Sequence, residues 1–118
     1  MVKRAQDMEV FKLSHSLTLE IYNLTERLPD KERFGLSAQM RRSAYSIPMN
    51  LAEGAARLSS KEYRQFVSMA RGSASEITYQ LLLCKDLGYI TEERYVSLNE
   101  KCNRVARMLT GLIKNLNN

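Results

Sequence analysis

Apolar residues recur along most of this chain at intervals of three and four, the spacing that places side chains on one face of an α-helix. The pattern divides the 118 residues into four amphipathic stretches, and we predict helices over residues 7–28, 31–57, 60–87 and 91–116. The last stretch has the clearest repeat: from Leu98 onward, steps of four and three alternate, as in helices that supercoil around one another.

The ends of the predicted helices carry recognisable signals. Pro29 stops the first helix, because a residue before proline is driven away from helical geometry. Ser59 and Glu62 form a capping box at the start of the third helix, Gly88 fits the position after its end, and Thr91 caps the fourth. The connections between helices are therefore short.

Pro48 lies inside the second predicted helix. It has no amide proton to donate to the Ala44 carbonyl, so we expect a kink there. The start of this helix is less defined, because Gly35 weakens its first turn.

Four amphipathic helices with short loops favour one all-α domain spanning residues 1–118, an antiparallel up-down-up-down four-helix bundle. The longest stretch without a charged residue is 43–52, too short to cross a membrane. The amino terminus lacks the apolar segment of a secretory signal, and two cysteines are too few for a disulfide scaffold. These features together predict a cytoplasmic protein.

The net charge of +5 is concentrated in one part of the sequence. Residues 33–71 contain seven basic side chains and two acidic ones, whereas the remainder of the chain is balanced. A local basic excess suits a polyanion, because each phosphate that is neutralised releases counterions. The same composition also fits a solvated helix face partly paired with acids.

A series of short motifs distinguishes the second and third helices from those of an ordinary bundle. The motifs are Phe34-Gly35-Leu36, Gln39-Met40-Arg41-Arg42, Ser46-Ile47-Pro48, Asn50-Leu51-Ala52-Glu53-Gly54, and Gly72-Ser73 with Glu76. Over nearly the whole chain, the sequence resembles the small bacterial four helix bundle proteins, also called 23S rRNA intervening-sequence proteins. That family takes its name from reading frames within insertions in large-subunit rRNA genes.

The chain is also similar to the accessory variability determinant of diversity-generating retroelements. That protein is a basic, ring-forming bundle of five subunits that associates with a reverse transcriptase and nucleic acid. This resemblance implies a homo-oligomer, with a pentamer favoured, and RNA or DNA as a partner.

Antiparallel pairing of the second and third helices places Arg42 opposite Glu76. We therefore predict an Arg42–Glu76 ion pair at the edge of the core. The remaining members of the predicted structural polar network are Gln39, Ser46, Asn50, Glu53 and Ser73. If Arg42 is occupied in this way, the nucleic-acid-binding candidates are Arg33, Arg41, Arg57, Lys61, Arg64 and Arg71.

The sequence offers little to support catalysis, a metal site or a cofactor. His15 has no second ligand one helical turn away, so we predict no metal. Cys84 and Cys102 fall on core positions at different levels, as expected for packing thiols. We predict a non-enzymatic oligomer that binds nucleic-acid backbone. The alternative is a protein-interaction module that uses off-core apolar side chains, namely Leu19, Tyr45 and Met69.

Overall fold

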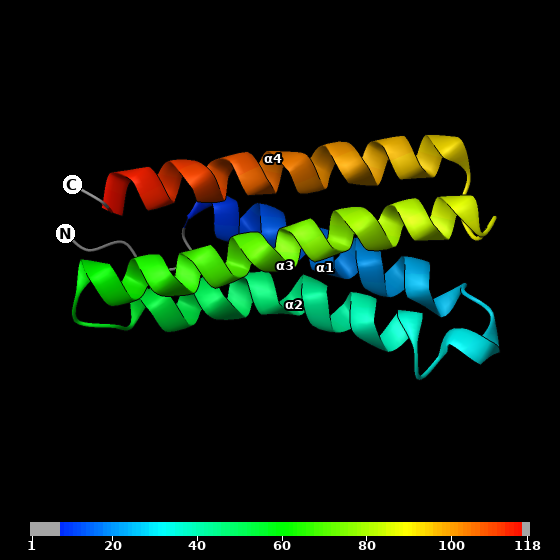
Figure 1. Ribbon diagram of the computed structural model, residues 1–118, viewed down its shortest axis with the longest axis horizontal. Coiled ribbons are helices and arrows are strands. Elements are labelled where there is room, and N and C mark those ends of the chain that lie inside the picture. The colour runs from blue at the N-terminus through cyan, green and yellow to red at the C-terminus, as the bar shows by residue number, and fades with distance from the viewer. Residues whose placement is uncertain (1–7, 117–118) are drawn as a thin grey trace.

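The computed structural model describes residues 8–116, which form an all-α bundle without β-strands. Its helices are α1 (Glu9–Glu26), the short 3-10 helix η2 (Asp30–Glu32), α2 (Leu36–Ala55), α3 (Ser60–Asp86) and α4 (Glu92–Leu116). The four α-helices lie along the long axis of a molecule about 46 Å long (Figure 1). The α2–α3 connection lies at one end and the other two connections at the opposite end, so consecutive helices run in opposite directions.

The helices form a ring in which α1 packs on α2, α2 on α3, and α3 on α4. The ring closes where α4 returns to α1, and this last pair packs less extensively than the others. The α1–α2 seam and the α3–α4 seam are therefore on opposite sides of the bundle.

Three of the predicted helix ends are formed by the expected residues, although only one of the two hydrogen bonds of the Ser59–Glu62 capping box is present. The Ser59 hydroxyl accepts a hydrogen bond from the Glu62 amide at 3.1 Å, and the Thr91 hydroxyl accepts one from the Arg94 amide at 3.1 Å. Gly88 follows α3 with a positive φ of 79°. The amides of Gly88 and Tyr89 donate back to the last turn of α3, which is the hydrogen-bond pattern of a Schellman motif.

The predicted second helix, residues 31–57, is wrong at its start, and it extends two residues beyond the observed end at Ala55. Its first part is the separate η2, and α2 begins only after Gly35, whose backbone φ and ψ of −109° and −105° are not helical. At the other end α2 stops at Ala55, and the apolar Leu58 beyond it is fully exposed. The glycine breaks the helix because its lack of a side chain lets the backbone leave the helical region at little cost.

One apolar core runs along the bundle axis and draws on all four helices. Its largest fully buried side chains include Leu17 and Ile21 from α1, Ile47 from α2, Ile77 from α3 and Leu109 from α4. The apolar positions spaced at three and four residues thus face this core for most of each helix. Leu87, the last residue of the predicted third helix, is half exposed.

Pro48 lies buried inside α2, and the helix continues through it. The carbonyl of Ala44, which loses its helical partner to the proline, accepts a hydrogen bond from the Thr18 hydroxyl of α1 at 3.1 Å. Thr18 is itself buried, and its hydroxyl also lies 2.8 Å from the Ser14 carbonyl. A side chain of one helix therefore replaces a backbone bond that the next helix lacks. The predicted kink itself stays a prediction.

Helices α2 and α3 approach each other closely beside Gly54. A β-carbon at this position would lie 2.9 Å from the β-carbon of Phe66 and 2.9 Å from the Tyr63 ring. Only glycine fits this crossing without displacing a neighbour, which gives the last residue of the Asn50–Gly54 motif a packing role.

Both cysteines are buried and unpaired, as expected for packing thiols. Burial raises the pKa of the Cys102 thiol to about 12, and burial together with the nearby Glu32 carboxylate raises that of Cys84 to about 11. Neither thiol is poised to react. No helix in residues 8–116 is long and apolar enough to cross a membrane.

Candidate nucleic-acid interface

The six basic candidates do not form one continuous surface. Arg33 and Arg41 line a cavity at the α1–α2 seam. Arg57 and Lys61 flank the α2–α3 connection at the opposite end of the bundle, and Arg64 and Arg71 belong to α3. The charge concentrated in residues 33–71 is therefore divided between two sides of the molecule.

Three of the six make polar contacts with other side chains or the backbone. Arg57 is paired with Glu53 one helical turn away, at 2.9 Å, and both side chains remain about half exposed. Arg41 donates through Nε to the Thr25 hydroxyl at 2.7 Å, and Arg64 reaches the Leu116 carbonyl at 3.4 Å. An exposed pair such as Arg57–Glu53 contributes only about 0 to 1 kcal/mol, so it leaves the guanidinium open to competition from phosphate.

Arg64 and Arg71 share one stripe of α3, because seven residues make nearly two full turns. The Arg64 contact with Leu116 shows that this stripe borders α4. Arg71 is exposed and makes no ion pair with another residue of the described chain.

The second half of α4 supplies cations that the sequence analysis missed. Residues 101–116 contain four basic side chains and no acidic one: Lys101, Arg104, Arg107 and Lys114. Lys101 is occupied, since its ammonium group lies 3.0 Å from the Glu20 carboxylate and 2.6 Å from the Ser16 hydroxyl of α1. Arg104, Arg107 and Lys114 are exposed. Counting charge within this half-helix alone would have revealed them.

Arg107 and Lys114 also lie seven residues apart, and they line a shallow hollow on α4 of about 550 Å³. Gly111 lies between them in the sequence and lines the same hollow, with open space where a side chain would stand. Ala106 and Thr110, which are partly buried, form the rest of its wall together with Asn103.

The two stripes are in register across the α3–α4 seam. The Arg64–Leu116 contact and the 3.2 Å contact of the Cys102 thiol with the Ala74 carbonyl fix the antiparallel register. That register places Arg71 level with Arg107, and Arg64 level with Lys114. The two levels are about 10 Å apart at the helical rise of 1.5 Å per residue. We call these four residues, Arg64, Arg71, Arg107 and Lys114, the α3–α4 basic face.

The predicted polar network lies in a groove between α2 and α3 with a volume of about 590 Å³. Its lining residues are Gln39, Arg42, Ser43, Ser46, Asn50, Met69, Gly72, Ser73 and Glu76. The hydroxyls of Ser46 and Ser73 are hydrogen-bonded across the two helices, and the Asn50 amide donates to the Ser46 carbonyl at 2.7 Å. Glu53 lies outside the groove and pairs with Arg57 instead.

The predicted Arg42–Glu76 ion pair is wrong. Both residues line the groove, as the helix register indicated, but their charged groups are not within ion-pair distance. Both side chains are exposed, and in water the small gain from pairing does not offset the loss of side-chain freedom. Arg42 is therefore available as a further cation. The cross-helix bond from the Gln80 amide to the Ser43 hydroxyl, at 3.1 Å, was not predicted.

The titratable groups with shifted pKa values are all explained by packing. The Tyr89 hydroxyl donates to the Glu32 carboxylate at 2.8 Å, which raises the tyrosine pKa, and burial raises that of Tyr63. No three potential metal ligands come together within residues 8–116, and His15 is exposed.

Comparison with known proteins places this geometry in a family. The family model described as 23S rRNA-intervening sequence protein matches residues 6–111. The chain belongs to this family. A crystal structure from Bacteroides thetaiotaomicron, of a protein with unknown function from the S23 ribosomal protein family, superposes with a TM-score of 0.83 at 30% identity. The match covers 89% of this chain and 98% of the other. No curated protein sequence matches the chain.

The family assignment confirms the resemblance on which the motifs were interpreted, and with it the all-α four-helix fold. In this 23S rRNA-intervening sequence protein, some of the motif residues pack helices together and others line a groove open to solvent. Gly54 and Pro48 shape the contacts of α2 with its neighbours, whereas Gln39, Arg42 and Glu76 face solvent from the walls of a groove.

Proposed function

We propose that this protein is a non-enzymatic, cytoplasmic bundle that binds the sugar-phosphate backbone of RNA or DNA without reading its sequence. The observation that carries the proposal is the α3–α4 basic face, in which two exposed arginines stand level with one another and a second pair of cations stands two turns away. Lys61 and Arg104 add charge at its margins.

The charge balance around this face favours an anionic partner. From Lys61 to Arg71 the only acidic side chain is Glu62, and residues 101–116 contain none. Glu100 lines one hollow together with Arg104 and Arg107, so cations still outnumber carboxylates around this face. Phosphate contacts from cations on two packed helices position a nucleic acid without specifying its sequence. The name of the family, which refers to a sequence within 23S rRNA, supports RNA as the first partner to test.

The salt dependence of binding follows from the number of cations. If the four residues of the basic face each neutralise one phosphate, the slope of log K against log salt is about −3 for a single strand and about −3.6 for duplex DNA. Filter binding of a structured RNA and a DNA duplex at several salt concentrations measures this slope.

The decisive variant replaces the two level arginines, Arg71→Gln with Arg107→Gln. We expect it to weaken binding and to make the slope shallower by roughly 1 to 2 units. The matched control, Arg27→Gln with Lys31→Gln, removes the same charge from exposed positions near the α1–α2 connection and should change the slope little. If both double variants change the salt slope equally, net charge alone attracts the nucleic acid, and the α3–α4 basic face is not the binding site.

A homo-oligomer is the second part of the proposal, and exposed apolar side chains support it. Leu19, Met49, Met69 and Tyr79 are each more than half exposed, on three different helices, and Tyr45 is 39% exposed. A protein-interaction module without a nucleic-acid role would use the same side chains. Light scattering of the purified protein gives the subunit number, and a strict monomer would exclude the oligomer while leaving the basic face to be tested.

A further inference from the structure

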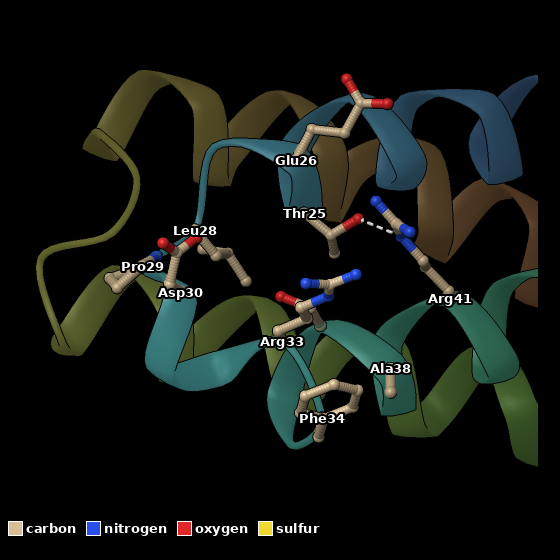
Figure 2. Close-up of a pocket in the computed structure, with 10 residues that line it drawn as sticks. Thr25, Glu26, Leu28, Pro29, Asp30, Arg33, Phe34, Ala38 and Arg41 are labelled. Atoms are coloured by element: carbon tan, nitrogen blue, oxygen red, sulfur yellow. Dashed lines mark hydrogen bonds between the residues drawn. The ribbon is translucent and has the colours of Figure 1, made fainter.

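A cavity of about 430 Å³ lies at the α1–α2 seam, on the side of the bundle opposite the α3–α4 basic face. Its walls are the end of α1, the connection through η2, and the first turns of α2 (Figure 2). This volume is within the range of small-molecule sites, which usually combine an apolar surface with a few converging polar groups.

Arg41 is held in place at one wall of this cavity. Its Nε donates to the Thr25 hydroxyl at 2.7 Å, and its guanidinium lies 4.7 Å from the centre of the Tyr22 ring. Thr25 is only 4% exposed and is anchored by its own hydrogen bonds to the Ile21 and Tyr22 carbonyls. The Thr25 contact uses Nε alone, so the two terminal nitrogens of Arg41 still have donors for an anion.

Arg33 and Phe34 form the opposite wall. The Arg33 guanidinium lies 5.4 Å from the centre of the Phe34 ring, and Phe34 is 88% exposed. Figure 2 shows the Arg33 and Arg41 side chains directed toward the same space beside Thr25. Neither guanidinium makes an ion pair with another residue of the described chain.

Two carboxylates also border the cavity. Figure 2 shows the Glu26 carboxylate directed away from the two guanidinium groups, and Asp30 lies on the far side of Arg33, next to Pro29. Bare phosphate would gain nothing from these carboxylates. A ligand that carries hydroxyl or amino groups beside its phosphate could donate hydrogen bonds to them.

We propose that this cavity binds a nucleotide, with the phosphate between Arg33 and Arg41 and the base against Phe34. Two guanidinium groups provide the bidentate, charge-assisted hydrogen bonds that suit a phosphate. An exposed aromatic ring beside them offers a stacking surface to any base. The carboxylates at the rim favour the ribose hydroxyls and exocyclic amino groups of a nucleotide over the phosphate ion alone.

The same ligand chemistry can come from a free mononucleotide or from one unpaired nucleotide of an RNA strand. The site does not rest on the proposed function, because its residues lie on another seam from the α3–α4 basic face. A variant of either site is thus a control for the other.

The test is titration of the full chain with AMP, adenosine and inorganic phosphate. Binding is measured by calorimetry and by the chemical-shift changes of backbone amides. We expect AMP to bind more tightly than either fragment and to shift the amides of residues 25–41. The Phe34→Ala variant should weaken AMP binding roughly 5- to 150-fold, the loss of one stacked base, with phosphate binding unchanged. Arg33→Gln should weaken both AMP and phosphate.

The side chains of Arg33 and Phe34 are both exposed, so the Arg33→Gln and Phe34→Ala variants should keep the folded structure. Arg71→Gln with Arg107→Gln is the matched control and should leave AMP binding intact even where it abolishes RNA binding. Competition by a short single-stranded oligoadenylate then identifies the source: displacement of AMP indicates a strand, and its failure indicates a free nucleotide. Equal affinity for AMP and phosphate, an unchanged AMP affinity in Phe34→Ala, or no saturable binding would overturn the proposal.

Discussion

The hydrogen bond from Thr18 to the Ala44 carbonyl makes a measurable prediction about how α1 and α2 depend on each other. Replacing Thr18 with valine keeps the shape of the side chain and removes the hydroxyl, which leaves the carbonyl opposite Pro48 buried without a donor. An unsatisfied buried group costs about 1–3 kcal/mol. The hydroxyl proton is shared with the Ser14 carbonyl, so we expect Thr18→Val to destabilise the fold by about 1 to 2 kcal/mol.

The magnitude should depend on the residue at position 48. In a Pro48→Ala background the new amide of residue 48 can donate to Ala44, and the Thr18 hydroxyl is then no longer its sole donor. The cost of Thr18→Val should fall by about 1 kcal/mol in that background. Urea unfolding of the wild type, both single variants and the double variant gives this coupling energy directly, and the cycle cancels the greater hydrophobicity of valine.

A threonine elsewhere in the bundle provides the control. The Thr78 hydroxyl donates to the Ser75 carbonyl of its own helix at 2.6 Å, and no proline is involved. Thr78→Val should therefore show no coupling to Pro48→Ala. If Thr18→Val has the same cost with proline and with alanine at position 48, within about 0.3 kcal/mol, the hydroxyl does not satisfy the Ala44 carbonyl and our account of Pro48 is wrong.

Other predictions follow from the glycines, the groove and a buried thiol. Gly54→Ala should destabilise the fold by about 1–3 kcal/mol because its β-carbon would overlap Phe66, whereas Gly72→Ala, with open space around it, should stabilise it by about 0.5–1 kcal/mol; urea unfolding that gave both changes the same sign would contradict this contrast. Glu76→Gln should change the unfolding free energy by less than about 0.5 kcal/mol, since the side chain is exposed and not paired with Arg42. A larger loss of stability would indicate that Glu76 and Arg42 do form an ion pair in solution. Burial raises the pKa of the Cys102 thiol from 9.0 to about 12, so above pH 9 the unfolded chain loses the thiol proton first and the free energy of unfolding falls toward pH 12. In Cys102→Ala, urea unfolding across this pH range should show a shallower fall. An identical slope in the variant would mean that the pKa of Cys102 is not raised by folding.

The bundle could be predicted from the sequence because apolar spacing and capping residues are local signals. Thr91, Gly88 and the Ser59–Glu62 pair act where they stand in the sequence, through bonds to residues three to five positions away. The break after residues 30–32 was not predicted, because Gly35 inside an apolar pattern is compatible both with a weak helix and with no helix.

The candidate sites were less predictable, because they depend on how exposed side chains are placed. The register of α2 and α3 correctly brought Arg42 and Glu76 to one groove, yet a shared level does not bring two solvated charges together. The cations of α4 were overlooked because acidic residues elsewhere balance them in the sequence. Only the antiparallel register shows that Arg107 of α4 is level with Arg71 of α3.

The Lys101 bridge to Glu20 and Ser16 has a consequence for the order in which the molecule assembles. These contacts join residues 81 and 85 positions apart in the chain, whereas the hairpins of neighbouring helices close much shorter loops. We therefore expect the α1–α4 seam, which packs less extensively than the other seams, to close late in folding. Partial opening of this seam should let the amide protons of α1 that lie beside it exchange with solvent. Their exchange should be faster than that of the amides in the hairpin of α3 and α4.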